Sequence, residues 1–180
     1  FDPPIEYYIV YQPQGWGPPA NQGDVIKGWG PKAFEALQKL ADDPAWRPYK
    51  PQIMGLLQQI DSPERVKFFE SEVQRLLDEP ESDQNNADLG QAIGRLAHVD
   101  YGAFTKVLDS KLSTASPARK TTLAQPLFWA IGGEHGKDAE SRLVELEKGM
   151  PERMQKYVHD TINANNAKKR AQEPMQKILD

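Results

Sequence analysis

The fold is decided by residues 121–165, which read TTLAQPLFWAIGGEHGKDAESRLVELEKGMPERMQKYVHDTINAN. Apolar side chains recur in this stretch at the three- and four-residue spacing of helices, and glycines interrupt the pattern at Gly132-Gly133 and Gly149. The apolar positions of the three segments are Leu123, Leu127 and Ile131, then Ala139, Leu143 and Leu146, then Met154, Val158 and Ile162. The stretch predicts three amphipathic helices joined by short turns, each of which needs a neighbour to cover its apolar face.

The same pattern extends back along the chain to residue 31. Ser62-Pro63 and Ser116-Pro117 are typical of helix starts, because serine caps a helix and proline at the next position loses no hydrogen bond. Asp100 is expected to cap the helix that follows it. The acidic and polar segment 79–86 is expected to be a solvated loop. Besides the helices from 62 and 116 onward, we predict helices over 31–41, 50–60, 87–97 and 101–113.

These helices fall into pairs that begin near residues 31, 63, 100 and 136. The spacings of about 32, 37 and 36 residues are typical of α-solenoids, in which each repeat is a helix–turn–helix. A helical bundle without repeats is the alternative. Either architecture is all-α.

Two segments of this pattern correspond to each other. They are LGQAIGRLAHVDYGAFTKVLDSKL (89–112) and PLFWAIGGEHGKDAESRLVELEKG (126–149), in which His98-Val99-Asp100 and His135-Gly136-Lys137-Asp138 hold matching places. Over about residues 31–165 the pattern resembles HEAT-like repeats, of the HEAT and armadillo class of α-solenoids. The resemblance implies a right-handed α-α superhelix of about four helical pairs, which presents a helical surface to another macromolecule.

Residues 1–30 have a different composition and are expected to form an extended N-terminal arm. The segment IEYYIVY at 5–11 is aromatic and β-branched, which predicts an extended strand. A Pro/Gly-rich stretch follows it and contains Gly-Trp-Gly-Pro at 15–18, a motif that recurs at 28–31. The predicted organisation is therefore an arm over 1–30, a helical repeat domain over 31–167 and a charged tail over 168–180. Pro174 is expected to break that tail and leave room for only a short terminal helix.

Composition excludes several classes of function. The net charge of −4 gives no electrostatic attraction to nucleic acid or anionic lipid, and no apolar run approaches the roughly 18 residues of a membrane span. With no cysteine, the chain has no disulfide, thiolate metal site or cysteine nucleophile. The first residue is Phe1, which raises the expectation of a processed secreted or periplasmic protein; a cytoplasmic protein cut for expression would begin in the same way.

The sequence favours a protein that is not an enzyme and carries no metal or cofactor. Its three histidines, His98, His135 and His159, lack the spacing of a zinc helix, and no nucleotide-binding or nucleophile motif is present. Glu134, His135 and Asp138 are near enough in sequence to hold a metal, but the same residues suit a structural turn, which is the interpretation we favour.

The predicted function is therefore protein binding or scaffolding through a helical-repeat surface. Large aromatic side chains are the usual anchors of interfaces, and the candidates are Trp46, Trp129, Trp16 and Trp29. Trp46, held between Pro44 and Pro48, is the first choice for an exposed anchor, whereas Trp129 is expected to be buried between repeats. The alternatives are a hydrolase with a site assembled from separated residues, and an inhibitor or immunity-type protein that blocks a partner enzyme.

Overall fold

The computed structural model describes residues 5–10 and 28–176, and these residues form helices and connecting turns without a strand. This confirms the all-α class. None of the helices in the described ranges combines the length and the apolar character needed to cross a membrane. The chain divides into two compact units, Phe1–Phe69 and Glu70–Asp180, and helix α5 (Arg65–Asp78) contributes residues to both. Each unit is described separately.

In the first unit, helix α3 (Gly30–Asp42) packs against helix α4 (Lys50–Gln59), and the 3₁₀ helix η1 (Pro44–Tyr49) connects them. Phe34 and Leu37 of α3 are buried with Ile53 and Leu57 of α4. Both helices carry a proline in the first turn, where its missing N–H loses no hydrogen bond. This apolar layer is the core of the first unit.

The predicted strand at 5–11 is wrong over the residues that the structure describes. Residues Ile5–Val10 form a short helix, α1, which contacts α3. The aromatic and β-branched composition favours a strand locally, but Ile5 and Ile9 lie four residues apart and are both buried. In a helix, residues i and i+4 are neighbours on one face, so Ile5 and Ile9 are buried together, and tertiary packing overrides the local propensity here.

The second unit contains the helices after α5, namely α6 (Asp83–Val99), α7 (Tyr101–Lys111), α8 (Pro117–Ala130), α9 (Gly136–Glu147) and α10 (Glu152–Gln176). Two of the predicted caps are confirmed. The side chain of Asp100 accepts from the backbone N–H of Ala103 at 2.9 Å, and that of Ser116 accepts from Arg119 at 3.1 Å. Each cap satisfies an N–H group that has no partner within its helix.

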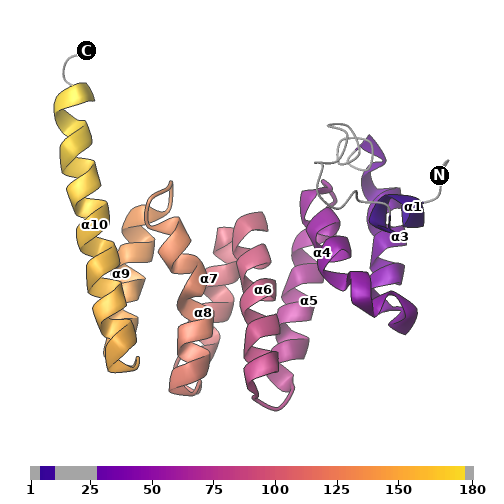
Figure 1. Ribbon diagram of the computed structural model, residues 1–180, viewed down its shortest axis with the longest axis horizontal. Helices are drawn as coiled ribbons and strands as arrows, with labels where there is room; N and C mark the ends of the chain where they lie inside the picture. The colour runs from indigo at the N-terminus through magenta and orange to yellow at the C-terminus, as the bar shows by residue number, and fades with distance from the viewer. Residues whose placement is uncertain (1–4, 11–27, 177–180) are drawn as a thin grey trace. The chain divides into compact units, whose positions relative to one another are not determined.

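Helices α6, α8 and α10 lie side by side in this unit (Figure 1), and α8 contacts both of the others. Leu123 and Leu127 of α8 are fully buried, as are Leu89, Ile93 and Leu96 of α6. Helix α9 packs against α8 and α10, and an ion pair between Arg142 and Asp109 joins it to α7. The predicted stripes of α8 and α9 therefore face the core of this unit, whereas in α10 Val158 is buried and Met154 and Ile162 are half-buried.

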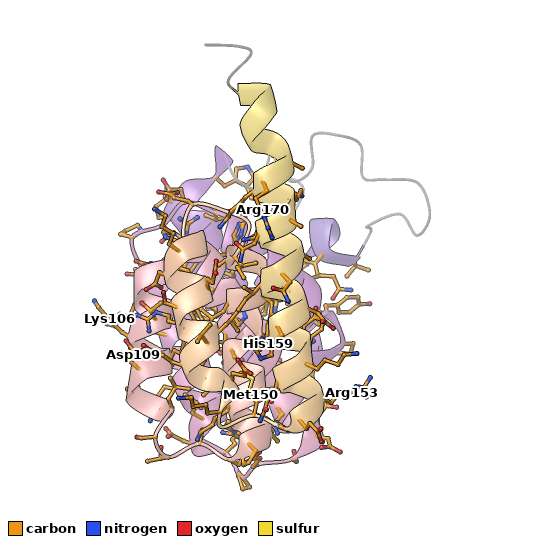
Figure 2. The ribbon with its side chains drawn as sticks, turned by 90° about the vertical axis from the view of Figure 1, so that its left-hand side faces the viewer. Lys106, Asp109, Met150, Arg153, His159 and Arg170 are labelled. Carbon is orange, nitrogen blue, oxygen red and sulfur yellow. The ribbon has the colours of Figure 1, made fainter. Side chains whose placement is uncertain are left out.

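The turn between α9 and α10 is short, and Met150 is buried within it. Across these two helices His159 Nε2 lies 2.6 Å from Glu147 Oε1. Figure 2 shows His159 on the side of α10 that faces α9, whereas Arg153 points away from α9. The ring of Tyr157 contacts Phe128 of α8, with centroids 5.0 Å apart. Helix α10 is therefore attached to both of its neighbours.

Two predicted boundaries are wrong. Residues 83–86 belong to α6 rather than to a loop, because Ser82 caps that helix by accepting from the N–H of Asn85 at 3.1 Å. Helix α10 continues to Gln176, past the break predicted at Pro174. A charged composition marks a segment as exposed, but it does not prevent helix formation.

Replacing Leu127 by alanine should destabilise the protein by roughly 2–5 kcal/mol, because the side chain is fully buried and its removal leaves a cavity. Urea denaturation followed by circular dichroism measures the change. The control is Val144→Ala, at a side chain that is 49 % exposed on α9, which should cost below about 0.5 kcal/mol. Equal costs for the two variants would contradict the assignment of the α8 stripe to the core.

Candidate functional site

A hollow of about 390 Å³ lies where the second unit brings the ends of two helices together. Helices α6 and α8 end at it, and the first residues of α7 and the turn before α9 complete it. We call it the Trp129 hollow. Its lining residues are Gly94, Ala97, His98, Val99, Tyr101, Pro126, Trp129, Ala130, Gly133, Glu134 and His135. The two segments with matching histidines, 98–101 and 133–135, therefore meet in one place.

Trp129 is the most prominent side chain of this hollow. It is 65 % exposed, so the expectation that it is buried between repeats is wrong. The indole lies against α6 at Gly94, where a methyl group in place of the glycine hydrogen would be 3.0 Å from Cζ3 of Trp129. Trp129 thus rests one edge on α6 and leaves most of its surface to solvent, which is the arrangement of an accessible aromatic anchor.

The hollow is also lined by two stacked rings. Tyr101 and His135 lie parallel, with centroids 4.0 Å apart and an interplanar angle of 3°. His135 occupies the N-cap position of α9, but its side chain makes no capping hydrogen bond there. Its imidazole is instead held against the tyrosine ring. The residue at this turn therefore contributes a flat aromatic surface to the hollow.

A hydrogen-bond network holds the Tyr101 side chain in place through its hydroxyl group. Its hydroxyl donates to Asp138 Oδ2 at 2.9 Å, and Arg142 Nε donates to the same oxygen at 2.8 Å. Burial, together with the hydrogen bond to Asp138 and the charge of that residue, raises the pKa of Tyr101 above its ordinary value. For Asp138, burial alone would raise the pKa, but the bonds from Tyr101 and Arg142 outweigh it and lower the pKa. The carboxylate therefore holds the tyrosine ring in place as a charged acceptor.

This network also bears on the metal interpretation of Glu134, His135 and Asp138. The Asp138 carboxylate is engaged by Tyr101 and Arg142, and the His135 ring is stacked on Tyr101. Across the described ranges, 5–10 and 28–176, the structure has no group of three His, Asp or Glu side chains placed to hold a metal. These contacts support the structural role for the turn that the sequence analysis favoured.

A second hollow, of about 320 Å³, lies near the starts of α6 and α8, and it is organised by a buried arginine. Arg119 is buried and donates to the side-chain oxygens of Asn85 and Asn86 and to the backbone carbonyl of Leu77. Ser116 Oγ donates to Glu81 Oε1 at 2.7 Å beside it. Arg119 lies on α8 and its acceptors lie on α5 and α6, so this cluster connects three helices.

Sequence reasoning missed Arg119, although a signal was present. Arg119 lies four residues before Leu123 and thus continues the spacing of the buried stripe of α8. A charged residue at an apolar position is buried only when its hydrogen-bond donors have acceptors. The side-chain oxygens of Asn85 and Asn86, at the start of α6, are acceptors for Arg119.

The other predicted anchors lie elsewhere. Trp46 is half-buried in η1 and contacts the ring of Tyr49, with centroids 5.6 Å apart. Trp29 is half-buried at the start of α3, and Trp16 lies outside the described residues. The structure therefore brings Trp129 together with Tyr101 and His135 in the second unit, whereas Trp46 and Trp29 belong to the first unit.

A scan against protein-family models, a search of curated proteins and a search of solved structures each found no match to this chain.

Tyr101→Phe should raise the pKa of Asp138 toward the ordinary value of an aspartate, because it removes one donor and keeps the ring that stacks on His135. A carboxyl ¹³C NMR titration measures this pKa directly. The stability that Asp138 contributes exists above its unfolded-state pKa and is lost as the pH falls through the lower folded-state value. The acid-dependent part of the unfolding free energy should therefore be smaller in the variant. An unchanged Asp138 pKa would contradict the network.

Gly94→Ala should move the Trp129 indole, because the new methyl group would lie 3.0 Å from the ring. The indole N–H resonance of Trp129 reports the displacement. Gly90→Ala is the matched control on the same helix, where the methyl group would meet the side-chain oxygen of Gln125 instead. Each change should also gain up to about 1 kcal/mol of helix propensity. Equal shifts of the indole resonance in the two variants would contradict the placement of Trp129 on Gly94.

Proposed function

We propose that this chain is a HEAT-like α-solenoid protein that binds a partner protein through the Trp129 hollow and is not itself an enzyme. The observation that carries the proposal is the exposed indole of Trp129 beside a preformed aromatic wall. Tryptophan and tyrosine are enriched among the residues that dominate binding energy at protein interfaces. A tryptophan that is 65 % exposed adds little to the core of its own chain, so its surface is available to a partner.

The rigidity of the hollow supports binding. Tyr101 is held by Asp138, and His135 is held by stacking on Tyr101. Trp129 is supported by α6 at Gly94. Side chains that are already ordered lose less conformational entropy on association, and this improves affinity for a given contact area.

The spacing of the helices along the chain supports the repeat interpretation. Helices α3, α5, α7 and α9 begin at residues 30, 65, 101 and 136, which keeps the period that the sequence predicts. Equivalent helices α6, α8 and α10 lie side by side, and the matching histidines face one hollow. A solenoid buries its apolar faces between successive repeats in this way and presents the repeat ends as a binding surface.

Trp129→Ala should abolish capture of the partner while changing the unfolding free energy by less than about 1 kcal/mol, since most of the side chain is exposed. The measurement is a quantitative pull-down with the tagged full-length chain from a lysate of the source organism, with the stoichiometry of each captured protein determined. Val144→Ala is the matched control, because it truncates another exposed apolar side chain of the same unit.

A partner captured equally by wild type and Trp129→Ala would remove the hollow from the interface. Absence of any stoichiometric partner for the wild-type chain would contradict the binding function itself. A partner retained by Val144→Ala and lost with Trp129→Ala is the expected result.

A further inference from the structure

One full charge lines the Trp129 hollow, and it is negative. Glu134 is the only residue in its lining that carries a full charge at neutral pH when histidine is counted as neutral, and its carboxylate side chain is exposed. No lysine or arginine lines the hollow. Of the cations near the lining, Arg142 is paired with Asp138 and Asp109, Arg95 is half-buried in α6, and Lys137 follows the turn.

The backbone adds to this negative character. Helices α6 and α8 both end at the hollow, and the C-terminal end of a helix carries a partial negative charge. The N-terminal ends of α7 and α9 lie nearby with the opposite partial charge. Each of these ends has its own carboxylate, Asp100 as the cap of α7 and Asp138 in the first turn of α9. The two N-terminal ends therefore have carboxylates beside them, whereas neither C-terminal end has a lysine or arginine in its last turn.

The aromatic surface suits a cation as well. The faces of indole and phenol rings attract ammonium and guanidinium groups, and guanidinium also stacks flat on such rings. The hollow combines the exposed indole of Trp129 with a carboxylate that can pair with the same cation. A volume of about 390 Å³ is large enough for one arginine side chain.

From these observations we infer that the hollow takes an arginine or lysine side chain from a basic segment of the partner protein. The inference rests on the proposed function and specifies the chemistry of its partner. The acidic net charge of the chain, −4, favours approach of a basic segment. An acidic segment would meet Glu134 and two helix C-termini, and a purely apolar side chain would leave Glu134 without a counter-charge.

The test uses three capped pentapeptides, with arginine, citrulline or glutamate flanked by glycines, titrated into the ¹⁵N-labelled full-length protein. The Trp129 indole resonance, identified by its loss in Trp129→Phe, reports binding. The arginine peptide should produce a saturable shift, and citrulline, which keeps the shape without the charge, should bind about fivefold more weakly. The glutamate peptide should produce no saturable shift. Equal binding of arginine and citrulline, preference for glutamate, or no saturable shift with arginine would overturn the inference.

Two charge variants sharpen this result. Glu134→Gln should weaken binding of the arginine peptide by about two- to fivefold, as expected for loss of an exposed ion pair. Glu145→Gln, at an exposed carboxylate of α9 that does not line the hollow, should leave the affinity unchanged. Equal effects of the two substitutions would show only a general response to net charge and would overturn the role of Glu134.

Failure of this inference can be distinguished from failure of the proposed function. If the arginine peptide leaves the Trp129 resonance unmoved but Trp129→Ala still loses the captured partner, the hollow binds protein of another chemistry. If the peptide does not bind and Trp129→Ala captures the same proteins as wild type, the protein-binding function of the hollow fails as well.

Discussion

The second unit depends on one constraint, namely that helix α8 has a single apolar stripe and must share it with its neighbours. Leu123 and Leu127 are fully buried at positions where α8 contacts α6, α9 and α10. Since 3.6 residues complete a helical turn, Trp129 lies roughly 200° around the helix from Leu127 and is turned away from this core. Burial of the stripe therefore determines which large aromatic side chain remains exposed. Gly94 on α6 then gives the indole a surface on which to rest.

The two hollows of this unit are built in different ways. Buried Arg119 lies near the starts of α6 and α8 and donates hydrogen bonds to Asn85, Asn86 and the Leu77 carbonyl. These bonds join α8 to α5 and α6. At the ends of α6 and α8, polar groups hold aromatic rings in place, as Asp138 does for Tyr101, and the rings themselves stay accessible. One hollow is filled by a network that joins helices, and the other leaves an ordered aromatic surface accessible.

The parts of the fold that could be predicted are those governed by local chemistry. Ser116 and Asp100 cap their helices because a side-chain oxygen satisfies a nearby N–H group, and the stripe of α8 follows from its period. The strand predicted at 5–11 failed because Ile5 and Ile9 meet a distant helix, which local propensity does not represent. The exposure of Trp129 was mispredicted although its position on α8 turns it away from the stripe, because the sequence does not show that α6 meets only one edge of the indole. The hollow requires residues 94–101 and 126–135 to meet, and the helical period together with the matched histidines was the sequence signal that these segments are equivalent.

The central claim is that the Trp129 hollow is the surface that contacts the partner. Site-specific photocrosslinking tests it most directly, with benzoylphenylalanine placed either at exposed His98 in the hollow or at exposed Val144 on α9. The full-length chain is irradiated together with its captured partner, and the crosslinked peptides are sequenced by mass spectrometry. We predict a crosslink from position 98 to a partner segment that contains arginine or lysine, and none from position 144. Equal crosslinking from the two positions, or crosslinking from position 144 alone, would contradict the assignment of the hollow as the binding site.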